Sequence, residues 1–218
     1  MSLIIIGFTF LINSDAIPYK FFHFWKIEGG LLEAIKHSWV IFLYGILINL
    51  WISTNRQQSH EELRTAEDLL LGGTMVSVWA GVVEEICFRW IIFYGVMCTL
   101  QLLNFFFFGW LGFGLLDFIY SWALVPVADF ARFEYLQPQL KSEFGWFVGA
   151  AIISSNGRFR EGHAYQGFRG YVASWFLGMF FFWIMFNYGL LEAIVVHFLY
   201  DFLIFFTVYL VLVVKRSS

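Results

Sequence analysis

The sequence predicts an all-α polytopic membrane protein, a bundle of about six to eight transmembrane helices that enclose a polar cavity. Composition is the first observation: 60% of the 218 residues are hydrophobic and only 13% are charged. Soluble domains are about 45–50% apolar and about 25% charged. The second observation is that the apolar residues form long runs, and a helix needs about 20 such residues to cross a bilayer.

Composition also narrows the range of partners. The mean hydropathy is +0.73 and the formal net charge is −3, so we expect a lipid bilayer and no nucleic acid as a partner. Cys87 and Cys98 lie in apolar segments and are not typical of a disulfide framework. No basic residue precedes the apolar run Leu3–Ile12, so we expect no cleavable signal peptide.

Residues 1–68 are predicted to hold N-terminal membrane segments and a loop. Leu3–Ile12 is too short to span a bilayer. Phe21–Lys26 is rich in aromatic residues and is typical of an aromatic belt at the water interface. His37–Ser53 is the first predicted span, and the polar stretch Thr54–Asp68 is predicted to be a loop or a surface helix.

Residues 69–214 form the second predicted unit, a helical core. A tight turn at Asn187–Gly189 joins its last two spans. An unusually aromatic stretch around 102–127 carries Asp117, for which we expect a structural role. The apolar stretches follow one another in this order: Leu69–Cys98, Leu102–Val127, Phe144–Ser155, Tyr171–Tyr188 and Gly189–Val214.

Two carboxylates and an arginine interrupt the first stretch of this core. A charged residue at the centre of a membrane helix costs about 2.5–3.5 kcal/mol, so such a group is retained when it pairs, reaches water or does chemistry. Glu85 and Arg89 are four residues apart and share one helix face, which predicts an ion pair. Glu84 points about 100° away from Glu85 and has no local partner. The unpaired carboxylate is therefore the first candidate functional group.

Two further polar clusters lie in later helices. Phe159 and His163 are four residues apart, as are His197 and Asp201. The second pair would allow the carboxylate to fix the imidazole tautomer, or both groups to face a common polar cavity. Each cluster taken singly is as compatible with helix packing as with function. Three clusters in succession at helical spacing are harder to explain by packing alone.

These three clusters read EExxxR, FxxxH and HxxxD, and they resemble the motifs of the CPBP family of intramembrane proteases. That family includes the type II CAAX prenyl endopeptidases and bacterial proteins linked to bacteriocin processing and self-immunity. The resemblance covers residues 69–214 and leaves the N-terminal part unmatched. The stretch His163–Gly167 resembles the His-x-Tyr-Gln-Gly version of many bacterial members. Three features depart from the family's pattern. Trp90 stands where glycine is common, and Asp201 stands where asparagine is frequent. The third is the extra aromatic span.

The resemblance implies a glutamic-type endopeptidase. Glu84 would be the catalytic carboxylate and would act with His163 to activate a water molecule against a peptide carbonyl. His197 and Asp201 would orient the substrate and stabilise the oxyanion. The supporting residues would be Glu85, Arg89 and Phe159. The substrate would be a membrane-associated peptide or protein tail, and the location would be a bacterial inner membrane.

The residues leave three questions open. The same glutamate, histidine and aspartate groups could bind zinc, but they do not form a HExxH pair and come from three helices. We therefore expect no metal and no cofactor, with zinc as the alternative. A non-catalytic immunity or partner-binding protein of the same fold is the alternative function. A small transporter or proton relay is a third possibility, although the sequence shows no inverted repeat.

Overall fold

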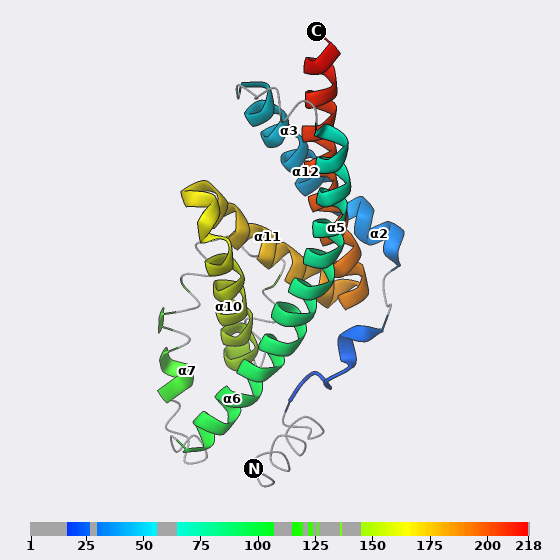
Figure 1. Ribbon diagram of the computed structural model, residues 1–218. Coiled ribbons are helices and arrows are strands. Elements are labelled where there is room, and N and C mark those ends of the chain that lie inside the picture. Colours follow the sequence, from blue (N-terminus) through cyan, green and yellow to red (C-terminus); the bar gives the residue numbers. More distant parts are fainter. Residues whose placement is uncertain are drawn as a thin grey trace.

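The computed structural model describes residues 17–26, 30–55, 65–106, 115–119, 122–123, 126, 136 and 145–217. All regular secondary structure within these ranges is helical (Figure 1), which confirms the all-α part of the predicted fold class; the predicted polar cavity is not confirmed. The elements in chain order are the 3-10 helix η1 (His23–Trp25), α2 (Leu31–His37), α3 (Trp39–Asn55), α5 (Ala66–Glu84), the π-helical η2 (Glu85–Ile92), α6 (Phe93–Phe106), α7 (Leu115–Ile119), α10 (Gly145–Gly162), the 3-10 helix η6 (Ala164–Gln166), α11 (Gly167–Asn187) and α12 (Leu190–Ser217).

Three helical segments in the described part of the chain are long and apolar enough to cross a membrane: Ala66–Asn104, Ala164–Asn187 and Leu190–Ser217. The pair α2 and α3 adds a fourth if it counts as one span bent by 51°. The chain is therefore a membrane protein, but the prediction of about six to eight spans is not confirmed. Most of the stretch predicted as the span Leu102–Val127 lies outside the described residues.

Some of the sequence predictions fall outside the described ranges. They include the short run Leu3–Ile12, most of the extra aromatic span around 102–127 and nearly all of the polar stretch after it. Asp117 belongs to α7, but its side chain is not among the described ones. These predictions stay predictions.

The aromatic segment Phe21–Lys26 is partly exposed and partly packed against other helices, and its place at the water interface stays a prediction. Phe22 is 64% exposed, whereas Phe24 is 4% exposed. The ring of Phe24 packs against Phe186 at a centroid distance of 4.9 Å, and Trp90 Nε1 donates to the backbone oxygen of Phe21 at 2.7 Å. A run of aromatic residues has the same composition whether it faces lipid headgroups or packs on other helices, so composition alone did not separate the two cases.

Small residues let α5 and α12 pack closely along their length. A Cβ atom on Gly73 would lie 2.4 Å from Cγ of Phe205, and one on Gly81 would lie 2.9 Å from the backbone oxygen of Ile194. Only glycine fits at these two positions without a shift of α12. The close approach brings the C-terminal end of α5 against the N-terminal part of α12, near Ile194.

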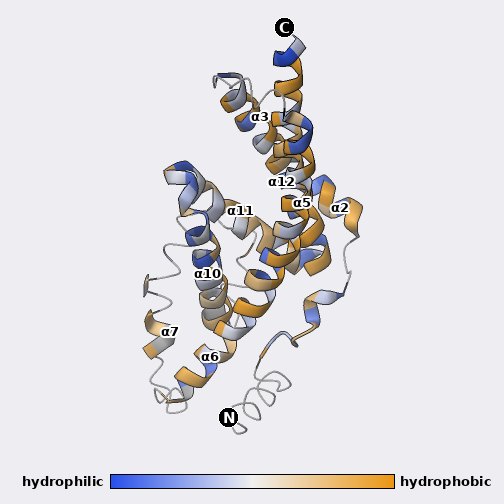
Figure 2. Cartoon of the chain, in the orientation of Figure 1, coloured by the Kyte–Doolittle hydropathy of each residue, from blue (hydrophilic) through white to orange (hydrophobic). Residues whose placement is uncertain are grey.

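The surface changes in character along the molecule. Figure 2 shows hydrophobic residues along α5, α6 and α12, and hydrophilic residues near the junction of α10 and α11. On α5, Met75 is 74% exposed and Trp79 is 69% exposed, as expected of side chains that face lipid tails. A tight turn at Gly189, whose φ is 125°, joins α11 to α12 and confirms the predicted turn.

Candidate functional site

The first two acidic residues lie where the long helix changes its winding. Glu84 is the last residue of α5, and Glu85 begins the π-helical stretch η2, which also contains Arg89. A π-turn is wider than an α-turn, and short π-helical segments are frequent at functional sites. Both carboxylates approach His197 on α12, although consecutive residues of a regular α-helix point about 100° apart.

The inner part of the site is buried and tightly held. We call Glu85, Arg89 and His197 the inner group; their side chains are 0%, 0% and 4% exposed. His197 Nδ1 donates to Glu85 Oε1 at 2.7 Å, and Arg89 Nε lies 3.3 Å from Glu85 Oε2. The imidazole also stacks on Phe181 at a centroid distance of 4.4 Å. The predicted ion pair of Glu85 and Arg89 is confirmed. The Glu85 carboxylate also fixes the orientation of the His197 imidazole.

The outer part of the site is more open. We call Glu84, His163 and Asp201 the outer group; their side chains are 27%, 18% and 24% exposed. Glu84 Oε2 lies 3.8 Å from His163 Nε2 and 4.0 Å from His197 Nε2. Asp201 Oδ2 lies 3.5 Å from His197 Nε2. These separations exceed those of ordinary hydrogen bonds, and a single water molecule can bridge such gaps.

The backbone fixes the orientation of His163. Its Nδ1 lies 2.8 Å from the backbone oxygen of Phe159, so in the neutral imidazole Nδ1 carries the proton and Nε2 presents its lone pair to Glu84. The ring of Phe159 packs against His163 at a centroid distance of 4.5 Å and lies 4.0 Å from the guanidinium carbon of Arg89. Phe159 therefore contacts both the inner and the outer group.

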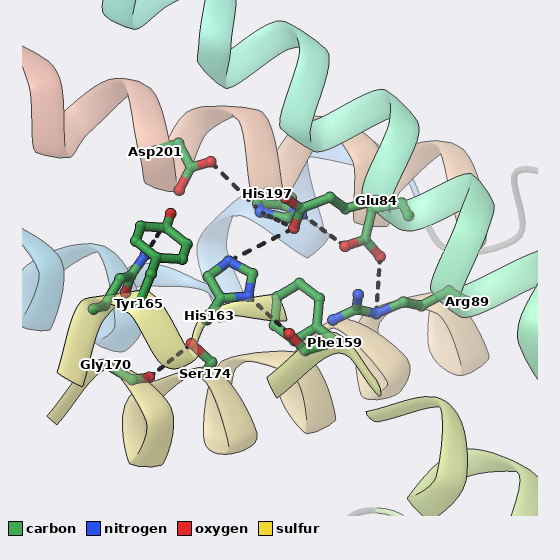
Figure 3. Close-up of polar contacts among 11 residues, drawn as sticks. Glu84, Arg89, Phe159, His163, Tyr165, Gly170, Ser174, His197 and Asp201 are labelled. Carbon is green, nitrogen blue, oxygen red and sulfur yellow. Dashed lines mark hydrogen bonds and ion pairs between the residues drawn. The ribbon is translucent and has the colours of Figure 1, made fainter. Parts of the chain in front are cut away.

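The structure brings the predicted site residues together, as Figure 3 shows for most of them. Glu84 is the last residue of α5, and His163 directly follows α10. His197 and Asp201 both belong to α12. The carboxylate that contacts His197 Nδ1 is Glu85, at 2.7 Å, and Asp201 lies 3.5 Å from the other ring nitrogen. The partners that Glu84 lacked locally are imidazoles of two other segments.

The charges of the site do not cancel. Three carboxylates face one guanidinium and two imidazoles, so neutral imidazoles leave two negative charges unbalanced. Glu84 Oε2 is buried and accepts no hydrogen bond from the described residues. An unpaired carboxylate oxygen between two imidazoles can accept a proton from a bound molecule.

Asn156 and Gly178 line the same region and were not predicted from the sequence. Asn156 precedes Phe159 by three residues and His163 by seven, which places all three on one face of α10. That spacing is a signal that could have identified Asn156. For Gly178 the sequence holds no such signal, because it contacts the site through the packing of α11 on α10.

Within the described ranges, no group of three or more His, Cys, Asp or Glu side chains is arranged to hold a metal ion. Comparisons with protein-family models, with curated proteins and with solved structures found no match.

Proposed function

We propose that the protein is an intramembrane endopeptidase, similar to the CAAX proteases of the CPBP family, that cuts a membrane-associated peptide or protein tail. One observation carries the proposal: Glu84 Oε2 lies within water-bridging distance of two imidazoles, 3.8 Å from His163 and 4.0 Å from His197. A carboxylate flanked by imidazoles and partly open to the outside is suited to proton transfer with a bound water molecule.

In the proposed reaction, Glu84 Oε2 and His163 Nε2 hold one water molecule between them. Glu84 takes a proton from the water molecule, and the oxygen of that water attacks the peptide carbonyl carbon. The carbonyl oxygen thereby becomes an oxyanion. The carbon–nitrogen bond then breaks, and Glu84 returns the proton to the leaving amine. The bond from His163 Nδ1 to the backbone oxygen of Phe159, at 2.8 Å, keeps Nε2 aimed at the water throughout.

His197 and Asp201 are proposed to orient the substrate and to stabilise the oxyanion. His197 donates from Nδ1 to Glu85, so Nε2 donates to the oxyanion in the imidazolium form. A donor that is already oriented stabilises developing charge without reorganising during the reaction. Asp201 Oδ2, 3.5 Å from that nitrogen, holds the imidazolium and accepts an N–H group of the substrate.

The proposed chemistry uses no metal and no cofactor, and the proposed location is a bacterial inner membrane. Zinc is the alternative to metal-free catalysis, and metal content measured in active, detergent-purified protein separates the two. A non-catalytic immunity or partner-binding protein is the alternative function. It would need neither the open Glu84 carboxylate nor the aligned His163.

Comparison of protein termini in membranes tests the proposal without a known substrate. Cells that express the wild-type protein are compared with cells that express Glu84→Gln, and new N-termini of membrane proteins are quantified. We expect a small set of termini that depends on Glu84. Glu67→Gln is the matched control, because Glu67 is on the same helix and its side chain is 61% exposed. Identical termini in the wild type and in a Glu84→Ala, His163→Ala double variant would contradict the proposal.

A further inference from the structure

Arg160, in the last turn of α10, carries a charge that no described residue neutralises. Within the described ranges, its Nε is buried without a hydrogen-bond partner, and no acidic side chain pairs with it. Arg158 differs, because its Nη1 lies 3.7 Å from Glu161 Oε2 and its side chain is 73% exposed. A half-buried guanidinium without a partner needs an explanation, since buried polar groups are nearly always hydrogen-bonded.

Two aromatic rings of α11 hold this guanidinium. Its Cζ lies 4.3 Å from the ring centroid of Tyr171 and 5.2 Å from that of Trp175, both within the range of a cation–π contact. One turn earlier on α10, Asn156 Nδ2 donates to the backbone oxygen of Trp175 at 2.9 Å, so the two helices are also joined there. The rings and the buried Nε leave the edge formed by Nη1 and Nη2 available to a ligand.

This edge lies where a membrane span begins. The candidate span Ala164–Asn187 starts four residues after Arg160. Tyr165 is 81% exposed and Phe168 is 82% exposed, and exposed aromatic side chains at the end of a span are typical of the membrane–water interface. The stretch Arg158–Tyr171 holds three arginines and one glutamate, and Figure 2 shows hydrophilic residues at this junction of α10 and α11. Arg160 is therefore at the level of the lipid headgroups, in a positively charged segment.

We infer that Arg160 is a binding site for the phosphate group of an anionic phospholipid. Two nitrogens at one edge of a guanidinium match two phosphate oxygens, and basic residues beside a span attract anionic headgroups. Inorganic phosphate offers the same oxygens, but the acyl chains of a lipid bring its headgroup to the level of Arg160. The inference does not depend on the proposed function, and its test requires no cleavage.

Native mass spectrometry of the full-length protein tests the site. The protein is studied in detergent micelles that contain phosphatidylglycerol and phosphatidylcholine with identical acyl chains. We expect the wild type to retain phosphatidylglycerol in preference to phosphatidylcholine. Arg160→Gln should weaken the affinity for phosphatidylglycerol about tenfold or more, because hydrogen bonds to a charged group are lost.

Arg158→Gln is the matched control, because it removes the same charge from the same helix. Its exposed, paired side chain should contribute less, so the affinity should fall at most about fivefold. Equal losses in Arg158→Gln and Arg160→Gln would indicate diffuse surface charge and would overturn the inference. A wild-type protein without preference for phosphatidylglycerol would overturn it as well.

Two further measurements separate a lipid site from other roles of Arg160. If Arg160 only clamps α10 to α11, Arg160→Gln lowers the melting temperature in neutral detergent and leaves the lipid affinity unchanged, which overturns the inference. If Arg160→Gln fails to fold, Arg160→Lys decides, since it keeps the charge but loses the planar fork. A weaker affinity for phosphatidylglycerol in Arg160→Lys supports the inference, and an unchanged affinity overturns it.

Inorganic phosphate distinguishes the two sources of the anion. Added in excess to the wild type, it should leave phosphatidylglycerol bound, because it lacks the acyl chains that hold the headgroup at the site. Displacement of the lipid by inorganic phosphate would assign the site to a soluble anion and would overturn the inference.

Discussion

The inner and outer groups of the site differ in burial and in the spacing of their atoms. Glu85, Arg89 and His197 are at most 4% exposed, and the short contact of 2.7 Å between Glu85 and His197 holds them together. Glu84 and Asp201 are 27% and 24% exposed, and their atoms stand 3.5–4.0 Å from the nearest imidazole nitrogens. The inner group resembles a structural core made of charges, whereas the members of the outer group make no direct hydrogen bond to the imidazoles that they face.

This difference teaches that one sequence motif can supply both parts. Glu84 and Glu85 are neighbours in the chain, yet the Glu85 side chain is 0% exposed and contacts Arg89 and His197 closely, whereas the Glu84 side chain is 27% exposed and stands 3.8 Å or more from its imidazole partners. Changes at Glu85 and Arg89 should therefore act on stability first, and changes in the outer group on chemistry first. Substitutions in each group test that division.

Glu84→Gln should give the largest loss. The amide cannot take the proton of the water, so we expect kcat to fall about 100- to 10,000-fold, the usual range for a lost general base. Because Glu84 is partly open, the melting temperature should stay close to that of the wild type. Peptide cleavage and thermal melting of the same preparation measure both, with Glu67→Gln as the control. A Glu84→Gln protein that unfolds would contradict the division of the site.

Arg89→Met should lower stability more than any change in the outer group. It leaves the carboxylate of Glu85 buried without its counter-ion, and breaking a buried pair in this way costs about 3–5 kcal/mol. Reversible unfolding in mixed detergents measures the free energy of unfolding. Arg169→Met is the matched control, since Arg169 is exposed and lies over Trp51 at 5.8 Å; a loss of the same size there would show that burial is not the cause.

His163→Gln should reduce kcat about 100-fold, at the low end of the range for acid–base groups, and should leave the unfolding transition in place. The glutamine keeps a polar group near Glu84 but lacks the ring nitrogen aimed at it by Phe159. Cleavage rates and melting temperatures provide the check. Normal cleavage by this variant would remove His163 from the proposed reaction.

Asp201→Asn should have a smaller effect, about fivefold in kcat/KM, because a partly exposed ion pair contributes at most about 1 kcal/mol. The activity of this variant should also depend less on ionic strength, since one solvent-accessible charge is gone. A salt titration of kcat/KM for both proteins measures this. A loss as large as that of Glu84→Gln would assign Asp201 a direct part in the chemistry.

Removal of metal should have the smallest effect of all, namely none. Activity of purified protein is measured after treatment with a strong chelator, and metal content is determined on the same sample. Loss of activity that zinc restores would favour the zinc alternative over the metal-free reaction.

Local spacing predicted the parts of the site that depend on helix geometry. The four-residue separations placed Glu85 beside Arg89 and His197 beside Asp201, and both contacts are present. Helical periodicity describes neighbours on one helix and says nothing about which helices meet. The bond between His197 and Glu85, 112 residues apart, therefore could not follow from spacing.

The remaining differences between the predicted and the observed structure also have causes that the spacing of residues along one helix does not reveal. The π-helical stretch Glu85–Ile92 has no composition signature, because its residues would suit an α-helix equally well. The predicted number of spans is not confirmed, since three or four helices of the described residues are long and apolar enough to cross a membrane. Gly178 gains its role from Asn156 and Arg89, which reach it from two other helices.

The most direct measurement is hydrolysis of a cleaved peptide in water enriched in the heavy oxygen isotope, with mass spectrometry of the products. We expect wild-type protein to place one heavy oxygen atom in the new C-terminal carboxylate, because the attacking group is a water molecule held by Glu84 and His163. Glu84→Gln and His163→Gln should yield almost no labelled product, and Glu67→Gln should match the wild type. Full labelling by Glu84→Gln, or cleavage without label in the wild type, would contradict the account.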